Sequence, residues 1–270
     1  MRRSFSFITA FGLVFGISVF CYAILAHSAN IRMFFDLNGF LLVAGGAMAS
    51  SMIAFHGRYV FRSLTSIFSN LFPYHITPKE LTREVRMMIE WSRDLQKEGK
   101  KGFENKVKSA NLKDPFIVFG LQLLSADYPK EELDYLLQNF INSYYERQMV
   151  QVTILHTMAG FSPAFGMVGT LVGMVTMMGH MGSDIASIGP GLSVALLATL
   201  YGLLLAQMIF KPAAEKVQQT QEMVKYRHSL LKECFLMIQS GENAFKIQDH
   251  VNSFLDPSIH IDLANPEKSK

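Results

Sequence analysis

Long apolar stretches alternate with charged ones along this chain. Four stretches are rich in hydrophobic residues and almost free of charge, at about residues 5–26, 40–55, 149–178 and 188–210. The second is the shortest, and its flank reaches back past Asp36 to Met33. A helix rises ~1.5 Å per residue and the hydrocarbon core of a bilayer is ~30 Å thick, so about 20 apolar residues cross it. The pattern therefore predicts four transmembrane helices.

The remaining segments have the pattern of water-exposed helices. In the segment from His56 to Gln148, Thr77-Pro78-Lys79-Glu80 combines a cap, a proline and an early acid, which predicts a helix start before an amphipathic run to Leu95. A second helix is expected over 130–148 after Pro129, and a third over 213–240, continuing the fourth apolar stretch. From Asp256 onward we expect a disordered tail.

The basic residues indicate the orientation. Of 25 Lys and Arg, two precede the first stretch, fourteen lie between Arg58 and Arg147, and eight lie from Lys211 onward, so only Arg32 falls in an opposite-side loop. Loops rich in Lys and Arg stay in the cytoplasm. We therefore expect an all-α, polytopic protein of the bacterial inner membrane with both termini in the cytoplasm.

This reading divides the chain into four segments. Residues 1–56 form transmembrane helices 1 and 2, 57–148 a cytoplasmic helical region, 149–210 transmembrane helices 3 and 4, and 211–270 a cytoplasmic helix and tail. A cleaved signal peptide is the alternative for the first stretch, since Arg2 and Arg3 precede it and small residues follow at 26–29. No A-x-A site stands there, and cleavage would leave an odd number of spans.

Composition excludes several classes. Half of the residues are hydrophobic, more than a cytosolic domain carries, and a net charge of +3 without a basic patch gives no support for nucleic-acid binding. Cys21 and Cys234 have no metal or disulfide spacing and are expected to be buried thiols. No cofactor is expected.

The third and fourth apolar stretches contain no Asp, Glu, Lys or Arg. An ion path through a bilayer usually needs such a group. Threonine and tyrosine hydroxyls at Thr170, Thr199 and Tyr201 can hydrogen-bond an ion or water but cannot hold a proton. A carboxylate would therefore come from a partner. His156 and His180 are expected to be a structural residue and a loop residue, with a proton relay as the alternative for His156.

Small residues four apart, as at Gly169 and Gly173, predict closely packed helices and an oligomer. Pro163 lies inside the third stretch and removes one backbone donor, which predicts either a hinge beside a polar cavity or a static kink. Pro212 marks the end of the fourth stretch at the cytoplasm.

The segment from Gly160 to Val175, GFSPAFGMVGTLVGMV, resembles the third span of the MotA and PomA stator proteins in the MotA/TolQ/ExbB channel family. Residues 188–202, IGPGLSVALLATLYG, resemble the family's fourth span, and residues 238–243 and 253–255 resemble its tail. The likeness covers nearly the whole chain.

This resemblance implies a flagellar motor stator subunit. Five copies would surround two copies of a MotB-like protein, whose single helix brings the ion-binding aspartate for a channel of H+ or Na+. Pro163 and Pro212 match prolines tied to ion flow and torque, and Thr170 and Thr199 match polar pore positions. Ala198 stands where sodium-driven relatives often carry a threonine, which leaves the ion open.

The resemblance also implies a cytoplasmic torque site that faces the rotor protein FliG. Glu104 matches the family's acid, whereas the usual Arg position holds Gln96, with Arg93 one turn earlier and Lys97 adjacent. Either basic residue could take that role.

Three other functions remain as alternatives. An ExbB- or TolQ-like energiser of an outer-membrane process has three spans and lacks the long segment between spans two and three, and a ZorA-like motor has a long cytoplasmic tail. A membrane scaffold without transport gives no role to the threonines of the apolar stretches. None of these readings makes the chain an enzyme.

Overall fold

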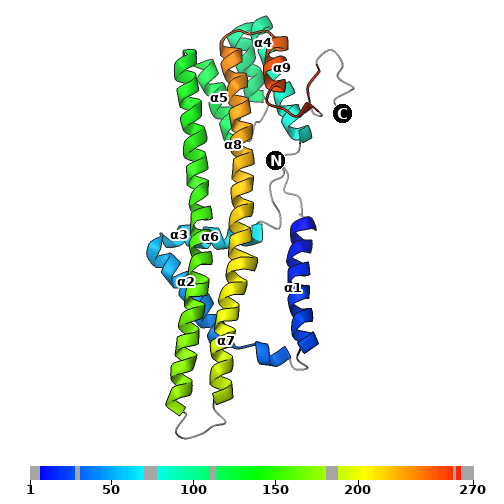
Figure 1. Cartoon of the computed structure of the whole chain (residues 1–270). Coiled ribbons are helices and arrows are strands. Elements are labelled where there is room, and N and C mark those ends of the chain that lie inside the picture. Colours follow the sequence, from blue (N-terminus) through cyan, green and yellow to red (C-terminus); the bar gives the residue numbers. More distant parts are fainter. Residues whose placement is uncertain are drawn as a thin grey trace. The chain divides into compact units, whose positions relative to one another are not determined.

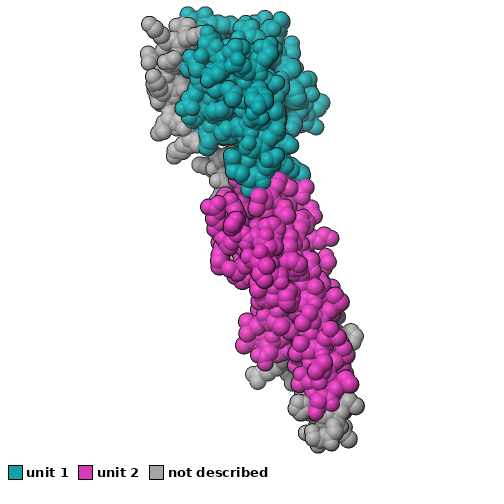
Figure 2. All heavy atoms as spheres, turned by 90° about the vertical axis from the view of Figure 1, so that its left-hand side faces the viewer, with its two compact units in different colours: residues 1, 75–147, 221–270 teal, residues 2–74, 148–220 magenta. Residues whose placement is uncertain are grey.

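The computed structural model describes residues 7–27, 31–69, 78–109, 114–180, 188–257 and 260–262. These residues form helices and short connections, with no strand in any of those ranges (Figure 1), which confirms the all-helical class. The chain divides into two compact units, coloured separately in Figure 2. Unit 1 comprises residues 75–147 and 221–270, and unit 2 comprises residues 2–74 and 148–220. The division into four segments stays a prediction.

Unit 2 is built mostly from apolar helices, with one amphipathic helix at Gly57–Ser69. They are α1 (Phe7–His27), the 3-10 helix η1 (Ile31–Phe34), α2 (Leu37–Ala54), α3 (Gly57–Ser69), α7 (Ile188–Leu204) and the π-helical segment η3 (Leu205–Phe210). Two longer helices contribute residues to both units, α6 (Lys130–His180) and α8 (Lys211–Gln239). The expected helices over 130–148 and 213–240 are therefore continuous with the apolar stretches beside them.

Three helices in the described ranges are long and apolar enough to cross a membrane. They are α2, α6 up to Gly179, and the continuous helix from Gly191 to Gln239. The first expected span coincides with α1, but its described apolar part, Ala10–Ala26, is shorter, and residues 5 and 6 lie outside the description. The structure thus supports three candidate spans, and the count of four stays a prediction.

Unit 1 packs α4 (Pro78–Ser109), α5 (Pro115–Ser125) and α9 (Ala244–Asn252) with parts of α6 and α8. Helix starts at Pro78 and Lys130 confirm the sequence prediction, although α4 continues well beyond Leu95. The core of this unit is apolar and fully buried, with Val85, Met88, Leu137, Phe235 and Ile247 among its members.

The chain after α9 returns to unit 1. Asn252 accepts from the backbone N–H of Ile261 at 2.8 Å and donates to its carbonyl at 2.9 Å, and Ile261 is buried. The expectation of a disordered tail from Asp256 is therefore wrong for residues 256–257 and 260–262, because the two hydrogen bonds between Asn252 and Ile261 and the burial of Ile261 fix the chain there. Residues 263–270 lie outside the described ranges.

Arg227 of α8 is 2% exposed and joins three helices. Its Nε and Nη2 donate to the two carboxylate oxygens of Glu84 in α4, at 2.5 and 2.8 Å, and Nη2 lies 2.7 Å from Asp114 Oδ2. Asp114 also caps α5 by accepting from the N–H of Phe116. Burial alone would raise the pKa of Asp114, but the charge and hydrogen bonds of Arg227 hold this pKa below its usual 3.8.

Arg227→Met should lower the free energy of unfolding of unit 1 by about 3–5 kcal/mol, because it leaves two carboxylates at a buried site without their cation. Chemical unfolding in detergent can be followed through Trp91, the single tryptophan of the chain, which is buried in α4. Arg83→Met, the same change at an exposed position of α4, is the matched control. Equal unfolding midpoints for the two variants would show that the buried pair contributes nothing.

His228 of α8 is 4% exposed and stacks on Phe116 with ring centroids 4.5 Å apart. Burial, with the nearby charge of Arg227, lowers the pKa of His228 from 6.5 to about 4. The unfolded chain therefore binds a proton that the folded chain excludes between these two pH values. Stability from this source is complete above pH 6.5 and declines as the pH falls toward 4.

From pH 7 to pH 5 we expect the unfolding free energy of unit 1, reported by Trp91, to fall with a slope approaching about 1.4 kcal/mol per pH unit. His228→Phe should remove most of this slope while keeping the ring stack. His56→Phe, at an exposed site in unit 2, should leave it intact. A slope that survives His228→Phe would assign the proton uptake to another group.

Candidate ion pathway

Helices α6 and α7 approach so closely that only small residues fit between them. A Cβ on Gly169 would lie 2.4 Å from Ala198 Cβ, and one on Gly173 would lie 2.9 Å from Ala195 Cβ. Such contact between backbones is the usual basis of helix association in lipid. Ala198 is fully buried in this contact, so the structure places it as a packing residue at the helix pair.

Two threonine hydroxyls meet across this interface. Thr170 Oγ1 lies 2.5 Å from Thr199 Oγ1 and 3.0 Å from the carbonyl oxygen of Ala195. Thr199 Oγ1 can also donate to the carbonyl of Gly166 at 3.3 Å. Both side chains are half-buried, so the two hydroxyls and two carbonyls form an oxygen-rich site inside an otherwise apolar helix pair. The structure thus brings Thr170 and Thr199 together, and their role as polar pore positions stays a prediction.

Pro163 lies on α6, about two helical turns before Thr170. The helix assignment of α6 is unbroken through Pro163. Because proline has no N–H, the carbonyl of Ala159 loses its usual donor. A Cβ on Gly202 of α7 would lie 2.6 Å from the carbonyl oxygen of Ser162 and 3.1 Å from Pro163 Cα, so α7 contacts α6 at this point.

Sequence analysis did not predict the π-helical segment η3, which ends two residues before Pro212. The N–H of Lys211 bonds to the carbonyl of Ala206, five residues earlier. Pro212 cannot donate to Met208, and the wider turn rearranges the carbonyls that this proline leaves without a donor. A proline following an apolar span was the available signal.

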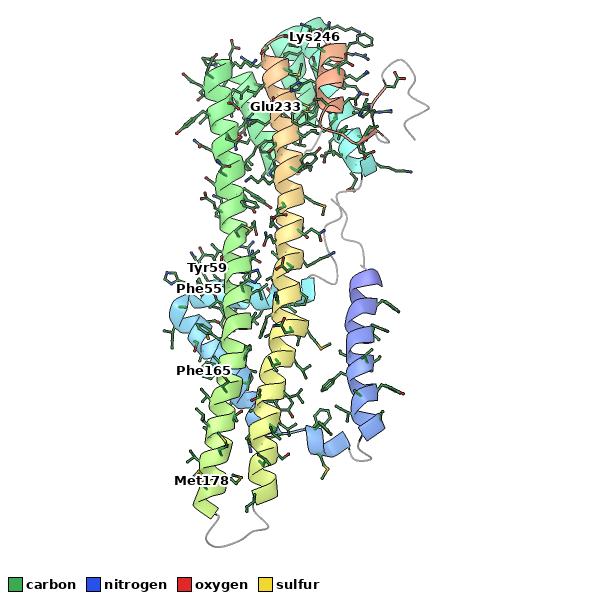
Figure 3. The ribbon with its side chains drawn as sticks, viewed as in Figure 1. Phe55, Tyr59, Phe165, Met178, Glu233 and Lys246 are labelled. Atoms are coloured by element: carbon green, nitrogen blue, oxygen red, sulfur yellow. The ribbon has the colours of Figure 1, made fainter. Side chains whose placement is uncertain are left out.

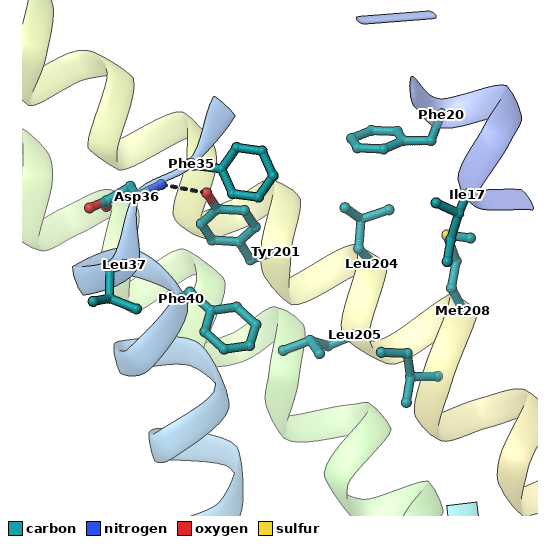
Figure 4. Close-up of a pocket in the computed structure, with 11 residues that line it drawn as sticks. Ile17, Phe20, Phe35, Asp36, Leu37, Phe40, Tyr201, Leu204, Leu205 and Met208 are labelled. Carbon is teal, nitrogen blue, oxygen red and sulfur yellow. Dashed lines mark hydrogen bonds between the residues drawn. The ribbon is translucent and has the colours of Figure 1, made fainter. Parts of the chain in front are cut away.

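Tyr201 faces away from the threonine pair. Its hydroxyl donates to the carbonyl of Phe34 at 2.6 Å and accepts from the N–H of Asp36 at 2.7 Å (Figure 4). The Asp36 carboxylate in turn caps α2 through the N–H of Asn38 and Gly39. Tyr201 therefore ties α7 to the start of α2, and the structure does not bring it together with the other candidate pathway residues.

A cavity of about 600 Å³ lies beside Tyr201, between α1, the start of α2 and the α7–η3 helix (Figure 4). Ile17, Phe40, Leu204 and Met208 are among its apolar lining residues. Such a surface offers an ion no replacement for its water shell. It is a space for apolar groups.

The side of α2 away from this cavity is packed on α6. A Cβ on Gly46 would lie within 2.2 Å of the ring of Phe165, whose position on α6 is labelled in Figure 3. His156, which precedes Phe165 on α6, is exposed and lies 3.9 Å from Glu215 of α8. In the described ranges no group of three His, Cys, Asp or Glu side chains could hold a metal ion.

The candidate rotor contacts belong to unit 1. Arg93 and Lys97 are exposed and one turn apart on α4, whereas Trp91 and Ser92 face the core. Glu104 lies in the same helix, but its side chain is outside the description. Sequence reasoning missed the role of Gln96 itself.

Gln96 donates through Nε2 to the carbonyls of Gly241 and Glu242, at 3.4 and 3.1 Å. It thus holds α4 to the turn between α8 and α9. This contact gives the glutamine a structural role at the position where the family usually has arginine.

Comparisons with known proteins agree with this architecture. The model of the MotA/TolQ/ExbB proton channel family matches residues 108–228. The chain is 32% identical over 249 residues to Motility protein A of Cereibacter sphaeroides, and 29% identical over 251 residues to Chemotaxis protein PomA of Vibrio alginolyticus. Each alignment covers 92% of this chain and 94% of the relative.

The fold is similar to a solved structure of the MotAB complex of C. jejuni. The TM-score is 0.83 at 18% sequence identity, with 94% of this chain and 98% of that chain covered. This likeness supports the fold, and the sequence relatives support the family. By its 32% identity to a Motility protein A over 92% of its length and its family-model match, this chain belongs to the MotA/TolQ/ExbB proton channel family, with the MotA and PomA stator subunits.

Proposed function

We propose that this chain is the flagellar motor stator subunit that forms an ion channel with a MotB-like partner and couples ion flow to torque on the rotor. The oxygen site at Thr170 and Thr199 carries the proposal. It lies in the apolar parts of α6 and α7, within residues 149–178 and 188–210, which contain no Asp or Glu, so the ion-binding carboxylate comes from the partner's single span. The transported ion, H+ or Na+, is the only small species required, and the chain is not an enzyme.

The proposed assembly has five copies around two partner helices in the inner membrane, with α1 as the fourth span and both termini in the cytoplasm. Exposed apolar residues on α6 and α7, such as Met167, Leu171 and Leu196, supply surfaces for further helices. On the cytoplasmic side, Arg93 or Lys97 together with Glu104 would contact FliG. An ExbB- or TolQ-like role is less favoured, because relatives named for motility align over nearly the whole chain.

Co-expression tests the channel. Cells that carry this chain with its MotB-like partner should take up ions down the gradient, whereas this chain alone should not, because the apolar parts of α6 and α7 contain no Asp or Glu. Intracellular pH and sodium indicators measure the flux, and removing sodium at a constant proton gradient identifies the ion. Brisk conduction by the chain alone contradicts the proposal.

The same assay examines the threonine pair. Thr170→Val together with Thr199→Val keeps the shape and removes both hydroxyls, and flux should fall about tenfold or more as the ion loses these oxygens. Thr176→Val, on the exposed side of α6, is the matched control and should conduct normally.

Charge reversal tests the rotor contact. Glu104→Lys should reduce motor torque at high load severalfold while membrane insertion and ion flux remain, because only the contact with the charged rotor changes. Bead rotation measures torque. Glu146→Lys makes the same reversal at an exposed position on α6, and unchanged torque is expected. Equal torque in the two variants would remove Glu104 from the contact.

A further inference from the structure

Helix α3 has two unlike faces. Val60 and Ser63 are fully buried, and Leu64 and Ile67 pack against the core formed with α6 and α8. The opposite stripe, at spacings of three and four residues, is exposed and consists of Arg58, Phe61, Arg62 and Thr65. One side of α3 is therefore fixed to the protein, and the other is available to the surroundings.

The position of α3 places this exposed stripe beside a membrane surface. α2, a candidate span, ends at Ala54, and α3 begins at Gly57, only two residues later. Figure 1 shows α3 lying across the direction of α2. Phe55 and Tyr59, labelled in Figure 3, mark the corner between the two helices. A helix set crosswise at the end of a span lies near the depth of the lipid head groups.

The stripe also has the chemistry of a lipid interface. Helix α3 contains two arginines and no Asp or Glu. Arg58 donates to the Tyr59 hydroxyl at 3.0 Å, and its guanidinium lies 4.8 Å from the centre of that ring. Phe61, 53% exposed, lies one turn from Arg58 and beside Arg62 in sequence. Guanidinium groups bind phosphate oxygens, and an aromatic ring between them suits the acyl boundary.

We propose that the outer face of α3 binds the phosphate head groups of anionic phospholipids, with Arg58 and Arg62 as the anion contacts and Phe61 directed into the acyl region. The charge of the stripe and its continuity with α2 favour a membrane over a protein partner. This inference requires only that α2 spans the membrane. It does not rest on ion conduction or torque, so the lipid proposal and the proposed stator function can be disproved independently of each other.

The test is a lipid titration of the full chain in detergent micelles, with a fluorescent label on Thr65→Cys in the outer stripe. Cys21 is exposed, so the expectation of a buried thiol is wrong there, and it is replaced by alanine. Cys234 is buried as expected, and burial raises the pKa of its thiol to about 12, which leaves it unlabelled. Phosphatidylglycerol should change the fluorescence, and phosphatidylcholine should not. The concentration for half the change should rise about fivefold for each arginine replaced by glutamine.

Two matched variants complete the test. Arg58→Lys with Arg62→Lys keeps the charge and should keep most of the response, whereas Arg83→Gln with Arg147→Gln removes two exposed arginines elsewhere and should leave it unchanged. The proposal is overturned if the Arg58→Gln, Arg62→Gln variant titrates like the parent. An equal response to inorganic phosphate, or one that follows protein concentration, would also overturn it in favour of a free anion or a second copy.

Discussion

The hydrocarbon core of a membrane offers no hydrogen-bond partner, and this constraint shapes unit 2. The hydroxyls of its buried serines donate to backbone carbonyls one turn earlier in the same helix. Ser51 donates to the carbonyl of Ala47 and Ser162 to that of Met158, both at 2.8 Å. Thr170 and Thr199 differ because their hydroxyls meet across two helices. The close approach at Gly169 permits this meeting, so the packing of α6 on α7 creates the polar site.

That site remains neutral. A hydroxyl can replace part of the water around an ion, but it cannot balance the ion's charge or exchange a proton near neutral pH. Under the proposed function, the cost of burying a carboxylate therefore falls on the partner chain. Division of the channel between two proteins follows from the chemistry of these two helices.

Most helices could be predicted because their signals are local. The start of α4 follows from Pro78 and Glu80, and the apolar length of α6 and α7 follows from the thickness of a bilayer. The contacts of Arg227 with Glu84 and Asp114 could not be predicted, because they join residues more than a hundred positions apart. From composition alone, Arg227 and its two carboxylate partners would be expected to lie on the solvent-exposed surface.

The candidate site residues likewise divide into those that local sequence signals identify and those whose contacts depend on long-range packing. The threonines were found because hydroxyls are conspicuous in apolar stretches, whereas the turn of Tyr201 toward Phe34 depends on the path of η1. The structural role of Gln96 likewise depends on a turn that begins at Ser240, which comes near α4 only in the folded unit. Sequence patterns identify the groups, and long-range packing decides which of them meet.

Pro163 and Pro212 differ in how far the helix around each can bend. Near Pro163, α6 is held by the contact of Gly202 with Ser162, and further along by the contact of Gly169 with Ala198, so bending there would separate backbones already in van der Waals contact. Beside Pro212 the helix has a π-turn, with fewer of the regular bonds that resist bending. Motion of the α6–α7 pair is therefore expected as one body, with the change of direction confined to η3 and the first turn of α8.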